Sequence, residues 1–245
     1  MLASLYRLNS ASLNHIYRLH FPHVSLRSCQ YVMKRLVDWG AVVAFDRRMG
    51  GPLRGSGQRI FALDPAAHRL MCRMEGYKDP IDTSEVNAGR WSHRHAMTIS
   101  ELYVRCVEAT RNDEIQLIEF TAEPASWWTY GHREILKPDA YLKIGLPDTR
   151  LRDHWWIEVD LGTESTPTVK TKFSAYLDFA ARNLPGPEDT VPRVLVTVLE
   201  QRRCTTLKRL VEHLGEDARH LIHVVPFDHA VPLLSTYANA PRRSI

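Results

Sequence analysis

Two apolar stretches in the middle of the chain carry acidic side chains in an unusual pattern. The first, from Ile135 to Ile144, contains Pro138-Asp139, and the second, from Trp155 to Leu161, contains Glu158 and Asp160. Side chains alternate along a strand, so Glu158 and Asp160 share one face while aliphatic residues occupy the other. A carboxylate on a buried strand is costly unless a cation, a lysine or water compensates it. Because clustered oxygen ligands suit Mg²⁺ or Mn²⁺, the pattern predicts a metal site for phosphodiester chemistry.

The size and composition indicate a globular protein with one large domain or two smaller ones. The chain has 245 residues, of which 44% are hydrophobic and 24% are charged. No apolar run approaches the ~20 residues that a membrane helix needs, and no signal-peptide pattern opens the chain. We therefore expect a cytoplasmic protein without a membrane partner. The cysteines form no CxxC pair, which disfavours a zinc ribbon and a disulfide framework, so we expect reduced and mostly buried thiols.

Positive charge is concentrated in the first third of the chain. Residues 1–80 contain twelve Lys and Arg against five Asp and Glu, an excess of seven positive charges. The remainder contains twenty basic and twenty-three acidic residues, an excess of three negative charges. This asymmetry suggests that the first third contacts a polyanion, with a solvated basic surface as the alternative.

The order of elements in that basic third is typical of a winged helix-turn-helix. Three helical segments come first, and the third has Ser25 at its N-cap and Gly40 just after its end. Strands over 41–45 and 58–63 then enclose a basic, glycine-rich tip. In this class of module the third helix enters the major groove, so we predict a DNA-binding domain over residues 1–76, with a protein-binding module as the alternative. The candidate DNA-contacting residues are Arg27, Gln30, Tyr31, Lys34, Arg47, Arg48 and Arg54.

The rest of the chain is predicted to form an α/β domain. Residues 77–90 are polar and indicate a linker, and residues 91–245 alternate helical with strand patterns. The continuous apolar run from Val194 to Leu199 predicts a central strand covered on both faces. We expect a mixed sheet flanked by helices.

This second domain resembles the PD-(D/E)xK nuclease superfamily. Pro138-Asp139 matches the opening pair of its motif, Glu158 matches the second acid, and Glu101 is placed as the acid of the first helix. The lysine expected two residues after Glu158 is replaced by Asp160. The resemblance implies that the following helix supplies the missing amine, from Lys172 in the first place and from Lys170 as the alternative.

A closer resemblance covers nearly the whole chain. The segments 15–21, 36–41 and 136–140, and the run Ile157-Glu158-Val159-Asp160-Leu161-Gly162-Thr163-Glu164-Ser165, are similar to the replication-relaxation family. The last run is the most specific of them. This resemblance implies DNA binding in the replication or relaxation of a plasmid, phage or integrative element.

The two resemblances together imply a candidate site for nicking DNA with Mg²⁺ or Mn²⁺. Its candidate catalytic residues are Asp139, Glu158, Asp160, Lys172 and Glu101, of which the first three are the candidate metal ligands. A relaxase that forms a covalent intermediate needs a tyrosine instead, and Tyr176, Tyr141 and Tyr17 stay open for that role.

The alternative function is a replication or transcription regulator without catalysis, in which the nuclease-like fold is a scaffold or a dimerisation body. As a partner we expect double-stranded DNA, and we leave open plasmid replication proteins and a homodimer.

Overall fold

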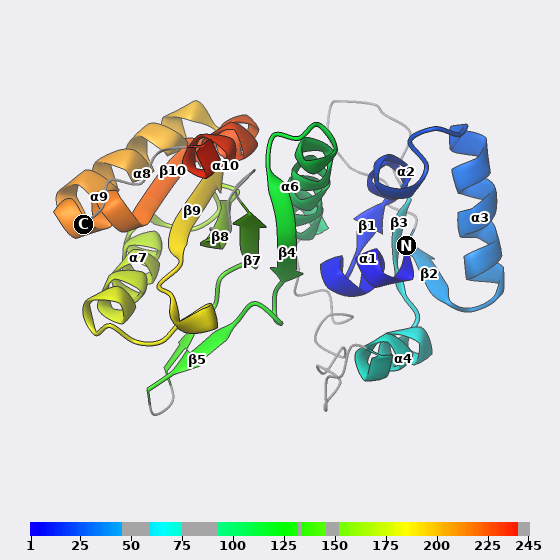
Figure 1. Cartoon of the computed structure of the whole chain (residues 1–245), viewed down its shortest axis with the longest axis horizontal. Helices are drawn as coiled ribbons and strands as arrows, with labels where there is room; N and C mark the ends of the chain where they lie inside the picture. Colours follow the sequence, from blue (N-terminus) through cyan, green and yellow to red (C-terminus); the bar gives the residue numbers. More distant parts are fainter. Residues whose placement is uncertain (46–58, 75–92, 132–133, 146–151, 240–245) are drawn as a thin grey trace. The chain divides into compact units, whose positions relative to one another are not determined.

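The computed structural model describes residues 1–45, 59–74, 93–131, 134–145 and 152–239, which form two compact units (Figure 1). The first unit is Met1–Val104 and the second is Arg105–Ile245. The division falls inside α6, His93–Arg111, and the predicted linker over 77–90 lies outside the described residues. Both units combine helices with β-sheet, which confirms the predicted α/β class.

The first unit contains short helices around a small antiparallel sheet. Its sheet has the strand order β1-β3-β2, so the two-residue β1 pairs with β3 on the side away from β2. The elements in chain order are α1 (Leu2–Leu8), β1 (Ala11–Ser12), α2 (Leu13–His20), α3 (Leu26–Asp38), β2 (Val42–Phe45), β3 (Ile60–Leu63) and α4 (Pro65–Met74).

Both predicted ends of α3 are confirmed. The Ser25 side chain accepts a hydrogen bond from the backbone N–H of Ser28 (3.3 Å), which satisfies one free donor of the first turn. At the other end, Gly40 has a φ of 69°, a conformation that glycine adopts without steric cost. The Ala41 N–H then donates to the carbonyl of Leu36 (3.0 Å), which closes the helix and turns the chain into β2.

The second unit is built on a mixed five-stranded sheet with the order β10-β9-β8-β7-β4. Strands β8, β9 and β10 are parallel, while β7 is antiparallel to β8 and β4 is antiparallel to β7. The sheet strands are β4 (Gln116–Ala122), β7 (Ala140–Gly145), β8 (Arg152–Asp160), β9 (Arg193–Val198) and β10 (Ile222–Pro226). A separate hairpin consists of β5 (Trp128–Tyr130) and β6 (Glu134–Leu136). The helices that follow β8 are α7 (Thr166–Ala181), α8 (Gln201–Leu214), α9 (Glu216–Leu221) and α10 (Ala230–Asn239), with short 3-10 turns η1 (Pro187–Asp189) and η2 (Phe227–His229).

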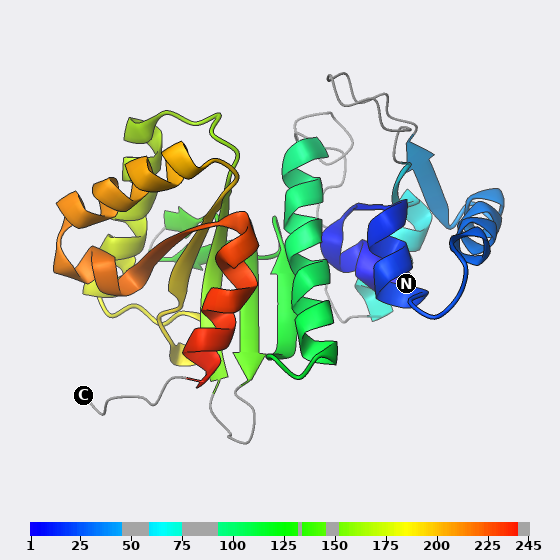
Figure 2. The same cartoon turned by 90° about the horizontal axis from the view of Figure 1, so that it is seen from above.

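The two faces of this sheet are both buried. Trp156 belongs to a hydrophobic cluster with side chains of α7 and α8, whereas Trp155 points the other way and stacks edge-on against Tyr237 of α10. Figure 2 shows α7, α8 and α9 grouped on one side of the strands, with α10 apart from them. Both tryptophans are fully buried, and β9 is buried along five of its six residues, which confirms the predicted central strand.

The four cysteines are free thiols inside the two units, as predicted. They are Cys29, Cys72, Cys106 and Cys204.

Within the described ranges, the helices are too short or too polar to span a lipid bilayer.

Candidate functional site

Asp139 is held at the point where β7 begins beside the end of β8. The register of the two strands ends with Ala140 paired to Ile157, and Asp139 comes directly before that pair. The Asp139 N–H donates to the carbonyl of Ile157 (2.9 Å), and its carboxylate accepts from the N–H of Val159 (2.6 Å). Because its backbone and its side chain both bind β8, Asp139 is fixed rather than free to rotate.

Glu158 faces α7. The residue at which α7 begins determines which side chains of this helix point toward the sheet. Ser165 caps this helix by accepting from the N–H of Thr168 (3.3 Å). Lys172 and Tyr176 come about two and three turns after Ser165, and they lie on the same side of the helix because they are four residues apart. The Tyr176 hydroxyl donates to one oxygen of Glu158 (2.5 Å), and the Lys172 amine lies 3.4 Å from the other.

The electrostatic environment of Glu158 disfavours its negative charge. Burial and the neighbouring Asp139 carboxylate raise the pKa of Glu158 to about 8, although Lys172 and the Tyr176 hydroxyl oppose the shift. The surroundings of Glu158 therefore favour its protonated form. The Asp139–Glu158 pair needs more positive charge than the chain supplies, and this is the environment that a divalent cation fits.

Lys172 is the cation that this acidic pair receives from the chain. Burial lowers the pKa of its amine, but Glu158, Glu164 and Asp139 raise the pKa by more, so Lys172 stays charged. A second ion pair joins the amine to Glu164 (3.0 Å), the residue just before the cap of α7. Lys172 thus bridges the end of β8 and the start of its own helix, and its catalytic role stays a prediction.

The structure places the predicted ligand Asp160 against a different partner. The Arg203 guanidinium, in the first turn of α8, binds both Asp160 oxygens at 2.7 to 3.2 Å. The N–H of Gly162 also donates to Asp160 (2.7 Å). Because both oxygens already have strong donors, Asp160 orders the turn after β8, and its role as a metal ligand stays a prediction.

Glu101, the predicted acid of the first helix, lies within the first unit. One of its oxygens is 2.6 Å from the Arg18 guanidinium and 3.3 Å from the His15 ring. These contacts join α6 to α2, so Glu101 has a structural role there. Its catalytic role stays a prediction.

The three candidate tyrosine nucleophiles differ in their hydroxyl partners. Tyr176 is buried and donates to Glu158, while Tyr141 is buried and its hydroxyl lies 2.6 Å from Nδ1 of His154. The Tyr17 hydroxyl donates to the carbonyl of Val24 (3.1 Å). Burial, followed by the charge of Glu158, raises the pKa of Tyr176 well above its usual range, so this hydroxyl keeps its proton and serves to position Glu158.

Two contributors to the site were not predicted from sequence. Arg203 neutralises Asp160, and the N–H of Glu123 donates to the carbonyl of Asp139 (2.9 Å), which brings a third acidic residue next to the pair. The first had a positional signal, since the start of α8 follows β9 and β9 runs parallel to β8. Glu123 comes directly after β4, and nothing in its local pattern distinguishes it.

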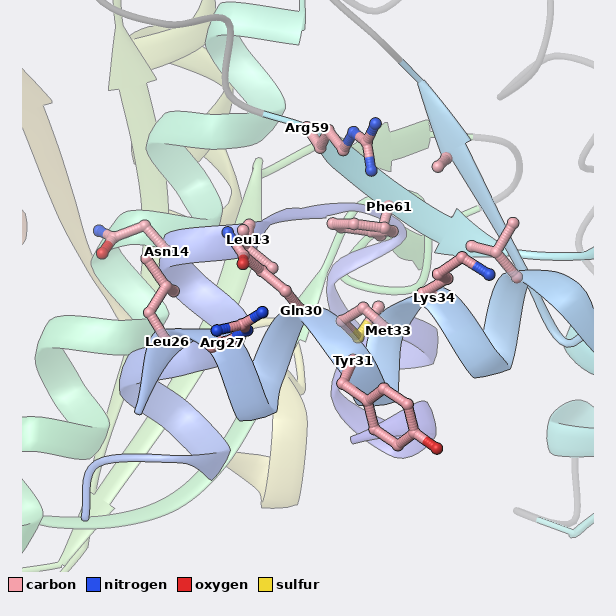
Figure 3. A pocket seen from close by; sticks show the side chains of 12 residues that line it. Leu13, Asn14, Leu26, Arg27, Gln30, Tyr31, Met33, Lys34, Arg59 and Phe61 are labelled. Carbon is pink, nitrogen blue, oxygen red and sulfur yellow. The ribbon is translucent and has the colours of Figure 1, made fainter. Parts of the chain in front are cut away.

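The first unit contains the predicted DNA-contacting face as an open groove of about 800 Å³. Arg27, Gln30 and Lys34 project from α3 on one side, and Figure 3 shows Arg59 and Phe61 on the other. Lys34 also pairs with Asp38 one turn along the helix (2.9 Å). Tyr31 lies at the groove edge with 63% of its surface exposed. The three other predicted contacts, Arg47, Arg48 and Arg54, lie outside the described residues.

The geometry thus defines an α/β protein with an open basic groove in one unit and a buried acid–lysine cluster in the other. A family model described as replication-relaxation matches residues 2–194, which include both features. The chain belongs to the replication-relaxation family, and this membership supports a role in the replication or relaxation of a plasmid or another mobile element. No curated protein and no solved structure matches the chain.

Proposed function

We propose that the protein binds the DNA of a plasmid, phage or integrative element and nicks it with a divalent metal. The observation that carries this proposal is the convergence of Asp139, Glu158 and Lys172 at the adjoining ends of β7 and β8. Burial and the neighbouring Asp139 carboxylate raise the pKa of Glu158 there, and a strongly shifted pKa in a cluster of charged groups supports a functional site.

The arrangement of the first unit supports DNA binding. The order α1-β1-α2-α3-β2-β3, with β1 paired to β3, is the order of a winged helix-turn-helix. In such a module α3 enters the major groove, and here α3 presents Arg27, Gln30 and Lys34 to an open groove. Arg27 has no acidic partner among the described residues, so its charge is available to a phosphate.

The arrangement of the second unit supports a PD-(D/E)xK-like fold. One helix precedes an antiparallel β4-β7-β8 segment, and α7 then connects β8 to the parallel strand β9. The acids stand at the start of β7 and near the end of β8, as the resemblance implies. Lys172 reaches Glu158 from α7 instead of from the strand.

The proposed chemistry assigns a separate task to each residue. Asp139 and Glu158 would hold Mg²⁺ or Mn²⁺, which supplies Lewis-acid activation of the scissile phosphate and of a bound water. Tyr176 keeps Glu158 aimed at the site, and the Lys172 ammonium donates hydrogen bonds to the phosphate oxygens as negative charge grows on them. A P–O bond would form to the water oxygen as that water releases a proton to solvent, the P–O bond to the DNA strand would break, and the departing oxygen would take up a proton from solvent.

A nicking assay on supercoiled plasmid with Mg²⁺ or Mn²⁺ tests the proposal. Asp139→Asn and Glu158→Gln should each reduce the nicking rate by about 100-fold or more, because each removes a charged ligand while preserving its shape. Glu134→Gln is the matched control, since Glu134 is an acid of the same unit that pairs with Arg182 at the surface. Equal rates in all four proteins would overturn the catalytic assignment.

A wild-type protein that binds DNA but nicks none would favour the alternative function, a regulator that uses this fold as a scaffold. The replacement of the strand lysine by Asp160, which Arg203 holds, is the observation that favours that alternative.

A further inference from the structure

The flank of α3 beside the groove carries an exposed stack of three planar side chains. Tyr31, Arg35 and Trp39 are spaced four residues apart and therefore follow one stripe of the helix. The guanidinium carbon of Arg35 lies 4.6 Å from the centre of the Trp39 ring and 5.8 Å from the centre of the Tyr31 ring. We refer to these three side chains as the α3 stack.

Packing within the unit does not account for the α3 stack. The opposite side of α3 is anchored by Cys29 and Met33, which are almost completely buried. Trp39 is 67% exposed and Tyr31 is 63% exposed, although large aromatic rings are normally well buried. Large apolar surfaces left in water commonly mark a binding site. The stack therefore presents aromatic surface that a ligand can cover.

Charge identifies the kind of ligand. Among the described residues, Arg35 has no acidic partner, and its guanidinium contacts only the two rings. The acid nearest in sequence, Asp38, is engaged by Lys34. A stack that combines two aromatic faces with an unneutralised guanidinium suits a ligand that has both planar rings and negative charge. Nucleotides have both, because their bases stack on aromatic and guanidinium planes while phosphates pair with arginine.

We propose that the α3 stack binds unpaired nucleotides next to the duplex that the groove holds. This inference rests on the proposed DNA binding and specifies its substrate as DNA with unpaired bases. In a duplex each base is covered by its neighbours, so only an unpaired base can expose a face to Trp39 or Tyr31. Tyr31 lines the groove (Figure 3), and the Arg35 guanidinium lies over its ring, so the groove and the stack share this residue.

The test compares three DNA probes of equal length by fluorescence anisotropy with the full chain. The probes are a duplex, a duplex with a short unpaired stretch at its centre, and a single strand. Trp39→Ala should weaken binding to the second and third probes by roughly 10-fold, because each base–ring stack contributes that much to affinity. Binding to the plain duplex should change by less than about twofold, since its bases are not accessible to the ring.

Two further variants make the test specific. Arg35→Lys keeps the positive charge but removes the planar guanidinium, so it should also reduce the preference for unpaired DNA. Leu70→Ala is the matched control, because Leu70 is an apolar residue of α4 in the same unit and is 58% exposed. Thermal unfolding of each variant confirms that its fold is retained.

The outcomes separate this inference from the proposed function. If Trp39→Ala leaves all three affinities unchanged while the wild type binds duplex, the stack proposal is overturned and the groove proposal stands. A change of oligomeric state without a change in DNA affinity would overturn it too, and would assign the stack to protein association. Absence of wild-type binding to every probe would overturn the DNA-binding proposal and this inference with it.

Discussion

The acid cluster of the second unit and the basic groove of the first differ in how the chain compensates their charge. Asp139 and Glu158 are at most 7% exposed, and burial, followed by repulsion from Asp139, raises the pKa of Glu158 to about 8. Arg27 and Lys34 lie on an exposed helix face. Water already solvates the groove, whereas the cluster depends on what the protein or a bound cation provides.

This difference determines what a mutation in each region should reveal. A mutation that removes the partner of a buried charge lowers the free energy of unfolding, because water cannot replace the lost partner. A mutation of an exposed cation changes mainly the binding affinity and its dependence on salt. Salt ions screen an exposed charge beyond a Debye length of ~8 Å at physiological ionic strength.

The largest effect on stability is expected at Arg203. Its replacement by alanine leaves the Asp160 side chain, which is 6% exposed, without its guanidinium partner. Unfolding free energy should fall by about 3–5 kcal/mol, as for other buried pairs that lose one partner. Urea denaturation of the wild type and the variant provides the measurement. Arg182→Ala is the control, since its partners Glu134 and Asp178 are exposed and the change should be slight.

A small loss in Arg203→Ala would contradict this expectation. It would mean that water reaches Asp160, and it would favour Asp160 as a metal ligand.

The second effect is a pH dependence of stability that comes from Glu158. Its pKa is about 8 in the folded state against an ordinary value of 4.5, so the folded state binds the proton more tightly. The contribution of Glu158 to the unfolding free energy is complete below about pH 4.5 and is lost as pH rises through about 8. Between these values the unfolding free energy should fall by up to ~1.4 kcal/mol per pH unit. The unfolding free energy, measured by denaturation at several pH values across this window, should change less with pH in Glu158→Gln than in the wild type.

The same measurement of unfolding free energy against pH can be repeated with a divalent cation present. A divalent cation that binds the carboxylate form should stabilise the wild type more at pH 8 than at pH 5, and should have little effect on Glu158→Gln. Equal stabilisation at both pH values would argue that the cation binds elsewhere.

A smaller effect is expected at Tyr176. Its hydroxyl donates to Glu158 and lowers the pKa of that carboxyl, so Tyr176→Phe should raise the Glu158 pKa further. The loss of one hydrogen bond should cost about 1 kcal/mol of unfolding free energy. Carbon-13 titration of the Glu158 carboxyl checks the pKa directly. Tyr141→Phe is the control, because the Tyr141 hydroxyl contacts His154 instead. An unshifted titration in Tyr176→Phe would remove Tyr176 from the site.

Local patterns in the sequence were sufficient to predict much of this fold. The caps at Ser25 and Gly40 are set by neighbouring residues, and the alternation around Trp155 and Trp156 follows from strand geometry alone. The short elements were missed because tertiary contacts define them. β1 has two residues, and it is a strand only because Ala11 pairs with Phe61 of β3.

For the site, as for the fold, local patterns in the sequence were informative and contacts between distant elements were not. The acids and Lys172 could be placed because each lies within a periodic segment whose face is known. The pairing of Asp160 with Arg203 joins residues 43 positions apart, on different elements, and depends on how α8 follows β9. No pattern within either segment specifies that choice, so sequence reasoning left Asp160 among the ligands.

The groove of the first unit should show the smallest effect on folding and a clear effect on binding. Arg27→Ala combined with Lys34→Ala removes two exposed cations, so the slope of log affinity against log salt should fall by about 2. Titrations of duplex DNA at several salt concentrations measure this slope. Arg69→Ala with Arg73→Ala removes the same charge from α4 of the same unit and should leave the slope nearly unchanged. Equal reductions in both double variants would mean that the DNA responds to the net charge of the unit and not to the face of α3 that lines the groove.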